Sequence, residues 1–317
     1  MIRTGLTLLV TLAAVQVASA PEFENPVDCD IGTTCYIEDY FDHDTTSAKQ
    51  DFMCGLNTRD GHGGTDFAVL SFEAMHAGVD VYAVADGTVI GVRDGRPDSK
   101  TVDPASEYAC GNGVHIDHGD GWRTQYCHLK NASVAVDVGA QVSAGTVLGQ
   151  IGLSGRTNHP HLHLSVFKDG EKVDPFAPWG TPSCQGDADG GLWKTPPQYY
   201  AAGVSRAGFS TQIPSLGDVR SGTAKVDTIH GNDPIVLYAL FYLARPGDRL
   251  RVQATGPNGT IFQKELAQTD PKRTQMQAYG RRAPSEGWPE GRYHGRVMLV
   301  RDDQIIGLRH TDVIITH

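Results

Sequence analysis

The chain has 317 residues, of which 39% are hydrophobic, and its 37 acidic residues outnumber 27 lysines and arginines for a formal net charge of −10. This length suits two domains once a leader peptide is removed. The negative charge argues against nucleic-acid binding and decides little about other substrates.

The N-terminus has the features of a secretory signal peptide. Arg3 precedes an apolar run from Leu6 to Val17, and small residues follow at positions 18 to 20. The run is too short to span a membrane, so we predict a signal peptide at residues 1–20. Pro21 would hinder cleavage after Ala20, which leaves cleavage after Ser19 open. No other apolar run approaches about 18 residues, so we expect no membrane span and an exported protein, periplasmic or extracellular.

Six cysteines follow the signal peptide, an even number that favours up to three disulfides in an oxidising compartment. Cys110 and Cys127 flank a hairpin and are expected to pair across it. Cys29 and Cys35 are expected to close a small loop in an N-terminal disulfide-containing segment at 21–53, which leaves Cys54 for Cys184. A thiolate zinc site is the alternative, but no Cys-x-x-Cys occurs.

The first chemically informative segment is His62-Gly63-Gly64-Thr65-Asp66, followed by the apolar run 67–70. Glycines beside a histidine allow close backbone approaches that a side chain would block. A carboxylate at the start of a buried strand is costly unless it is paired or bound to a metal. The alternative is a glycine-rich turn in which Asp66 caps backbone amides.

Short strands are predicted after this segment. Residues 79–89 have the pattern of strand, Asp-Gly turn and strand, and valines and glycines recur from 138 to 152. They indicate hairpins in a small antiparallel barrel or sandwich. The pattern is similar to lipoyl and biotinyl carrier domains, but no lysine for cofactor attachment occurs between Asn131 and Lys168. His115 and His118 flank a hairpin turn and are interpreted as structural.

The run from His159 to Phe167 alternates polar and apolar residues, as a strand does. His161 and His163 should therefore point the same way, with Cα atoms about 6.6 Å apart. One metal cannot easily take both imidazoles, but one can be a ligand while the other reaches a metal-bound water. The alternative is an edge strand with two solvated histidines. His159 is a candidate for the wall of a cleft.

Three ordered motifs together resemble the LytM/lysostaphin-type zinc metalloendopeptidases, which carry His-x-Gly-x-Asp, Tyr-x-His-Leu and His-Leu-His. Here they are His62 to Asp66, Tyr126-Cys127-His128-Leu129 and His161-Leu162-His163, within a resemblance that extends from about Cys54 to Pro178. Cys127 is a departure, since many relatives lack a cysteine there. The resemblance implies a zinc peptidase domain at 54–180, Zn²⁺ ligands at His62, Asp66 and His163, catalytic non-ligand histidines at His128 and His161, and peptidoglycan peptides as the substrate.

The remaining chain is predicted to contain a linker at 181–204, rich in Gly, Pro and Asp, and an immunoglobulin-like β-sandwich at 205–317. Residues 235–243 form an apolar run, 249–254 alternate, and 256–259 have turn composition. Fold analogy suggests substrate docking or domain spacing for this part. Its histidines are scattered and indicate no catalytic cluster: His230, His294, His310 and His317.

The sequence thus predicts an all-β protein: a small antiparallel barrel or sandwich with lipoyl-like hairpins, then an immunoglobulin-like sandwich. We expect a secreted zinc metalloendopeptidase that cuts peptidoglycan cross-links or stem peptides with metal-activated water. One alternative is a non-catalytic LytM-like activator of other wall hydrolases. Another is a secreted protease that acts on glycine-rich proteins. The oligomeric state stays open.

Overall fold

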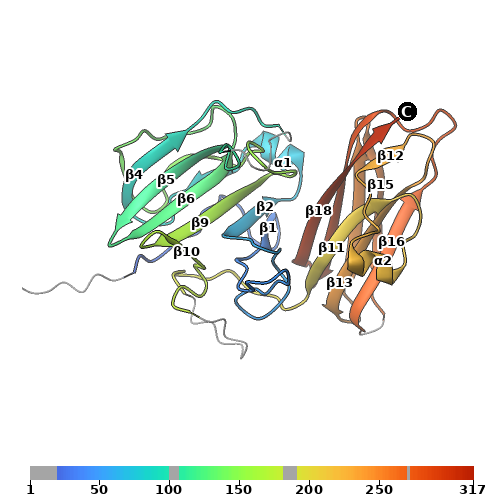
Figure 1. Cartoon of the computed structure of the whole chain (residues 1–317), viewed down its shortest axis with the longest axis horizontal. Coiled ribbons are helices and arrows are strands. Elements are labelled where there is room, and N and C mark those ends of the chain that lie inside the picture. The colour runs from blue at the N-terminus through green and yellow to red at the C-terminus, as the bar shows by residue number, and fades with distance from the viewer. Residues whose placement is uncertain (1–19, 100–106, 181–190, 270–271) are drawn as a thin grey trace, which may run out of the picture.

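The computed structural model describes residues 20–99, 107–180, 191–269 and 272–317, which form two β-sheet parts side by side (Figure 1). The all-β expectation is confirmed. The predicted signal peptide lies outside the described residues except for Ala20, and Cys184 lies outside them too. Within the described ranges, no helix has both the length and the apolar character that a bilayer crossing requires.

The N-terminal part, residues 20–99, 107–180 and 191–199, is built on one antiparallel sheet. Its strands lie in the order β1 (Cys35–Asp39), β2 (Thr65–Val69), β9 (His161–Lys168), β6 (Trp122–Leu129), β5 (Asn112–Gly119), β4 (Gly87–Arg93) and β7 (Gln141–Val142), and β10 (Glu171–Val173) also pairs with β9. A second, two-stranded sheet pairs β3 (Asp80–Tyr82) with β8 (Val147–Gln150). The described strands form open sheets and no closed barrel, so of the two predicted forms the barrel is absent.

The strand at 161–168 forms as predicted, because its alternate apolar side chains Leu162, Leu164 and Val166 are buried in the core. It is an inner strand, paired with β2 on one side and β6 on the other. The alternative of an edge strand with two solvated histidines is therefore wrong. One short helix, α1 (Phe72–Ala77), follows β2 and begins at Ser71, whose side chain accepts a hydrogen bond from the Ala74 amide.

The predicted Asp-Gly hairpin at 79–89 does not form, although both of its strands do. β3 pairs with β8, whereas β4 pairs with β5 and β7, so the chain passes from the small sheet into the main one. The segment between the strands bonds elsewhere: the Ala83 amide donates to Thr146 O. Local turn composition predicted a reversal, but pairing with distant strands decides the path of the chain.

Two of the predicted disulfides are present. Cys29 and Cys35 close the small loop before β1, and Cys110 and Cys127 join the segment before β5 to the end of β6. The predicted partner of Cys54 lies outside the described residues. The second disulfide immediately precedes His128, and therefore braces the chain at a candidate site residue.

The C-terminal sandwich, residues 203–269 and 272–317, has two sheets. One contains β11 (Gly203–Ser210), β13 (Ile235–Ala244) and β16 (Lys272–Arg281). The other contains β12 (Thr228–His230), β18 (Gln304–Thr316), β17 (Gly291–Arg301), β14 (Arg249–Gly256) and β15 (Gly259–Ala267). Buried residues of both sheets, such as Phe241 and Leu299, share one core, and α2 (Leu216–Ser221) packs Val219 against the outer face of β13. Tyr293 donates to Pro289 O, a hydrogen bond like that of the tyrosine corner in immunoglobulin-type sandwiches.

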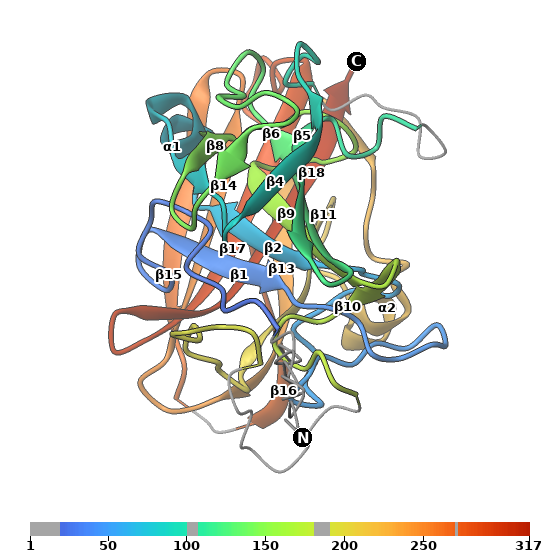
Figure 2. The same ribbon diagram turned by 90° about the vertical axis from the view of Figure 1, so that its left-hand side faces the viewer.

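The two parts are packed against each other along β1 and β18. Figure 1 shows β1 and β2 between the rest of the main sheet and the C-terminal sandwich, and in the turned view of Figure 2 they overlap strands of the sandwich. The contact has an apolar cluster that joins Tyr36 and Ala68 to Met298, Val300, Ile305 and Leu308. Burial of these side chains favours a fixed arrangement of the two parts over a loosely tethered one.

Candidate active site

Four segments bring the predicted site residues together. Asp66 lies on β2 and His163 on β9, directly opposite each other in the antiparallel register, and His161 is paired with Ala68 on the same two strands. His62 comes from the loop before β2, and His128 from the end of β6. The structure therefore brings all five residues to one place.

Asp66 is the centre of this cluster and is almost fully buried. Its Oδ1 lies 2.7 Å from His163 Nδ1, 3.1 Å from His62 Nε2 and 3.5 Å from His161 Nε2. Burial alone would raise the pKa of Asp66, but the neighbouring His62 and Arg59 hold it well below its usual range. The side chain is a carboxylate at neutral pH.

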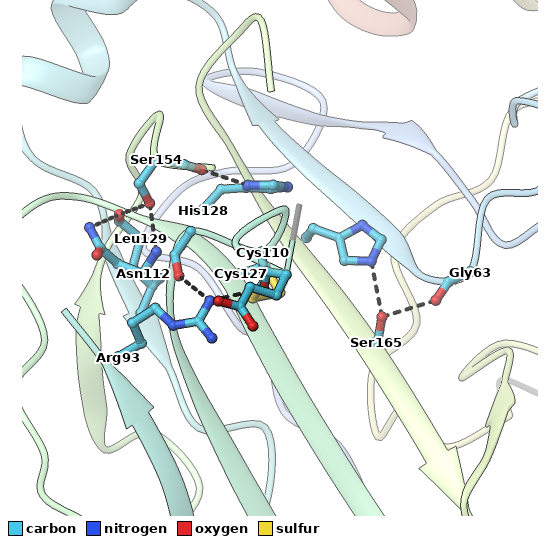
Figure 3. The surroundings of a disulfide bond; sticks show 12 residues. Gly63, Arg93, Cys110, Asn112, Cys127, His128, Leu129, Ser154 and Ser165 are labelled. Carbon is cyan, nitrogen blue, oxygen red and sulfur yellow. Dashed lines mark hydrogen bonds between the residues drawn. A yellow bond between two sulfur atoms is a disulfide. The ribbon is translucent and has the colours of Figure 1, made fainter. Parts of the chain in front are cut away.

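In His62 and His163, the ring nitrogen that points away from Asp66 makes a hydrogen bond, and this bond shows that the other nitrogen carries no proton. His62 Nδ1 lies 2.7 Å from Tyr40 O, a backbone acceptor, so Nδ1 carries the proton and Nε2 is bare. Ser165 Oγ donates to Gly63 O and therefore accepts from His163 Nε2, which leaves His163 Nδ1 bare. Figure 3 shows the hydrogen bond between Ser165 and Gly63. Such outer hydrogen bonds fix the tautomers of metal-bound histidines.

These three residues have the donor set that zinc prefers. His62 Nε2 and His163 Nδ1 are 3.2 Å apart, and both lie close to the Asp66 carboxylate. Two bare imidazole nitrogens and one carboxylate oxygen leave one tetrahedral position open, as in hydrolytic zinc sites. His62, Asp66 and His163 therefore fit a zinc ion.

Gly64 explains why the His62 segment is rich in glycine. A Cβ at this position would lie 2.6 Å from Leu164 O and 2.7 Å from the His163 ring. A side chain there would displace the ring from Asp66. The close approach expected from the sequence is thus required at Gly64.

His128 and His161 supply two further imidazoles whose rings lie 4.7 Å apart. His128 Nδ1 donates to Ser154 O, as Figure 3 shows, and His161 Nδ1 lies 3.1 Å from His159 O. Each ring therefore carries its proton on Nδ1 and leaves Nε2 free to accept one. Burial lowers the pKa of His128 to about 4 and that of His161 well below its ordinary value, so both are neutral bases.

The backbone at His128 is unusual, since its φ of 65° places a non-glycine residue in the left-handed region. The conformation is held by two backbone hydrogen bonds, from His128 N to Cys110 O and from Gly152 N to His128 O. Strained backbone that persists under such constraint is common at functional sites. Here it turns the His128 ring toward the cluster.

The site opens into a cleft of about 790 Å³ between the two parts of the chain. Its lining includes five basic side chains (Lys49, Arg59, Arg156, Lys172 and Arg309) and three acidic ones (Glu38, Asp39 and Asp60). Arg59 and Arg309 are paired with carboxylates of the site. The C-terminal sandwich contributes Ser205, Arg309 and His310 to its wall. The prediction that His310 is one of several scattered histidines is therefore wrong, because β18 packs beside β1 and carries it to the cleft.

Sequence reasoning missed two further side chains at the cluster. Arg59 Nη1 donates to Asp66 Oδ2 and to Asp39 Oδ2, both at 2.6 Å, and so holds the carboxylate from behind. Ser165 orients His163, and the period of β9 could have found it, because 161, 163 and 165 share one face. Only nearness to His62 pointed to Arg59.

Fold and site together define an all-β protein with a buried histidine–carboxylate cluster of residue types that can hold a metal ion. The family model described as Peptidase family M23 matches residues 60–175, and this region is a domain of peptidase family M23.

Two curated relatives match the same region. The chain is 36% identical over 113 residues to the peptidoglycan DD-endopeptidase ShyA of Vibrio cholerae, across 36% of this chain and 22% of that protein. It is 33% identical over 104 residues to the murein hydrolase activator EnvC of Escherichia coli, across 32% of this chain and 21% of that protein. The chain therefore spans about a fifth of the length of these relatives. Among solved structures, a zinc-containing peptidase from Vibrio cholerae matches at 26% identity and a TM-score of 0.29, over 44% of this chain and 39% of that one.

Proposed function

We propose that the protein is an exported zinc metalloendopeptidase that hydrolyses peptide bonds in peptidoglycan cross-links or stem peptides. One observation carries the proposal: His62 Nε2, Asp66 Oδ1 and His163 Nδ1 converge, with two neutral histidines beside them in the same cleft. Similarity to a peptidoglycan DD-endopeptidase supports the substrate class.

His62, Asp66 and His163 would hold the zinc ion. When bound, zinc supplies a Lewis acid that lowers the pKa of water toward neutrality and polarises a carbonyl. His161 Nε2, free of hydrogen bonds and aimed at Asp66, is placed to accept the proton of the attacking water. His128, whose ring lies 4.7 Å from that of His161, could use its Nε2 to stabilise the developing oxyanion or to pass a proton to the leaving amine.

Two basic side chains of the cleft, Lys172 and Arg156, support an anionic peptide as the substrate. Lys172 lies over Gly63, close to His62 and His163, and Arg156 lines the wall nearby. Peptides with free side-chain or terminal carboxylates would be attracted into such a cleft. The alternative substrate, an uncharged glycine-rich protein segment, would gain no such attraction.

A second candidate function is activation of other wall hydrolases without catalysis, which similarity to a murein hydrolase activator favours. An activator of this kind needs no intact metal site. Here His62, Asp66, His128, His161 and His163 are all present and lie together, so we favour the enzyme.

Digestion of purified peptidoglycan by the zinc-loaded chain, with mass analysis of the soluble products, tests the proposal. We expect new peptide termini that are absent after treatment with a chelator and return when zinc is added back. The His161→Ala variant should bind zinc and release nothing. Wall lysis only in the presence of a second hydrolase would support the activator instead, and cleavage of a glycine-rich protein but not of peptidoglycan would support the other protease.

A further inference from the structure

Beside the Asp66 cluster lies a second group of buried polar residues, which joins the C-terminal sandwich to the peptidase domain. Its centre is Glu38 on β1, 4% exposed. From β18, the His310 amide donates to Glu38 Oε1 at 3.0 Å, His310 Nδ1 donates to Oε2 at 2.9 Å, and Arg309 Nη1 donates to Glu38 O at 2.6 Å. The sandwich therefore fixes both the backbone and the carboxylate of Glu38.

Glu38 in turn fixes His159, a buried residue of the peptidase domain. His159 Nε2 lies 2.9 Å from Glu38 Oε2, and His159 Nδ1 lies 2.8 Å from Asn158 Oδ1. The orientation of the Asn158 amide is set by β18 as well, since its Nδ2 donates to Asp312 Oδ1 at 3.1 Å. Both edges of the His159 ring thus face acceptors whose positions depend on the sandwich.

His159 touches the candidate base His161 in two ways. The two rings are stacked, with centroids 4.8 Å apart and planes 24° from parallel. The carbonyl oxygen of His159 lies 3.1 Å from His161 Nδ1, and this contact keeps the proton on Nδ1 and Nε2 free. The His310 ring is stacked on His159 at 4.7 Å, so three rings in contact connect β18 to His161.

We propose that His310 is a positioning residue for His161, acting through Glu38 and His159, so that the C-terminal sandwich is part of the catalytic unit. This inference rests on the proposed function, because it assigns a purpose to the order of His161. It departs from the expectation that the sandwich serves only for substrate docking or domain spacing. A shift of about 1 Å in a catalytic group can cost on the order of a hundredfold in rate.

Glu38, His159 and His310 are also residue types that bind metals, and their side-chain atoms lie close together. The ring arrangement favours the positioning role. A metal binds an imidazole nitrogen within the plane of the ring, and the stacked rings of His159 and His310, only 15° from parallel, do not share such a point. Arg309, whose Nη1 lies 3.8 Å from Glu38 Oε1, already places a positive charge beside this carboxylate.

The test compares three variants of the full, zinc-loaded chain on purified peptidoglycan. His310→Leu removes the side-chain donor to Glu38, and His310→Asn keeps an N–H near the position of Nδ1. Leu308→Ala is the matched control, because Leu308 lies two residues away in the apolar contact between the two parts. Thermal unfolding of each variant reports whether it is folded.

We expect His310→Leu to lower kcat about 10- to 100-fold with KM changed less than about twofold, as for a misplaced catalytic group. His310→Asn should recover most of the loss, Leu308→Ala should keep the wild-type kcat, and every variant should bind one zinc ion per chain. A wild-type kcat in His310→Leu, or an equal loss in Leu308→Ala, would overturn the proposal. So would two zinc ions in the wild type and one in His310→Leu, which would identify a second metal site.

A readout without turnover separates this inference from the proposed function. In ¹⁵N NMR of the zinc-loaded wild type, His161 should be protonated on Nδ1 alone, and His310→Leu should show a mixture of tautomers. If the wild type cleaves no peptidoglycan, the proposed function fails, while the tautomer experiment still tests the positioning. An unchanged His161 tautomer and line width in His310→Leu would overturn it.

Discussion

Two carboxylates, Asp66 and Glu38, are each buried among histidines that line one cleft. In both cases burial would raise the pKa of the carboxyl group, and in both the histidines hold that pKa well below its ordinary value. Residue types and burial are thus nearly the same at the two centres. Nevertheless, the arrangement of the rings gives them different chemistry.

Around Asp66 the ring planes of His62 and His163 are 65° apart, and their bare nitrogens converge to 3.2 Å. Around Glu38 the rings of His159 and His310 are stacked. Every one of these four rings turns a nitrogen toward its carboxylate, so contact with the carboxylate does not separate the two centres. The relative orientation of the rings does: tilted rings can direct two lone pairs at one point, whereas lone pairs in the planes of stacked rings run side by side. Ring orientation is thus the feature that favours an ion at Asp66 over one at Glu38.

The contrast between the two carboxylate centres predicts its largest effect where a proposed metal ligand of the Asp66 cluster is removed. We expect His163→Ala to lose zinc on dialysis and to lower peptidoglycan cleavage by more than about a thousandfold, since the metal supplies most of the transition-state stabilisation. Glu38→Gln should keep one zinc per chain. Metal analysis after gel filtration measures both, and an active His163→Ala protein with stoichiometric zinc would refute the ligand assignment.

The next effect concerns His161, the proposed base beside the proposed metal site. His161→Ala should retain zinc and lose about 10²- to 10⁴-fold in kcat, the usual contribution of a general base. His115→Ala is a suitable control, because His115 lies on β5 of the same sheet and outside the cleft lining. Equal rates for the two variants would remove His161 from the mechanism.

The five residues of the Asp66 cluster could be predicted because each stands in a short local motif. Glu38 and His310 could not, since they are 272 residues apart and meet only when β18 packs beside β1. The strands likewise include one feature that local sequence predicts and one that it does not. Alternation of polar and apolar residues predicted β9, but no local pattern indicated that the main sheet stays open. Pairing partners and edges depend on contacts between distant segments, which spacing in the sequence does not record.

Removal of the Arg59 guanidinium is expected to have a smaller effect. Arg59 donates to Asp66 Oδ2, and the histidines lie beside Oδ1. Arg59→Gln should weaken zinc binding about 10- to 100-fold, as loss of an outer contact to a ligand usually does. Competition with a chromogenic chelator gives the affinity. Arg123→Gln is the control, because Arg123 also pairs with an aspartate but lies away from the cleft, and a similar loss in that variant would contradict the assignment.

The smallest effect distinguishes the Glu38 cluster through the pH dependence of unfolding. The pKa of Glu38 is depressed in the folded state, so its contribution to stability is present above its ordinary pKa of 4.5 and is lost as the pH falls toward the folded value. Burial lowers the pKa of His159, but Glu38 outweighs it and raises that pKa, so this contribution is present below the ordinary value of 6.5 and is lost as the pH rises through the folded pKa. Glu38→Gln should therefore be destabilised most between about pH 4.5 and 6.5. The loss should be only about 1 kcal/mol, because the Gln side chain still offers an acceptor oxygen.

Urea unfolding across this pH range measures the difference in the free energy of unfolding. Glu24→Gln is the control, because Glu24 pairs with Lys194 at an exposed position and its loss should cause no pH-dependent change. A Glu38→Gln deficit that does not vary with pH would mean that the carboxylate is held for its shape and not for its charge.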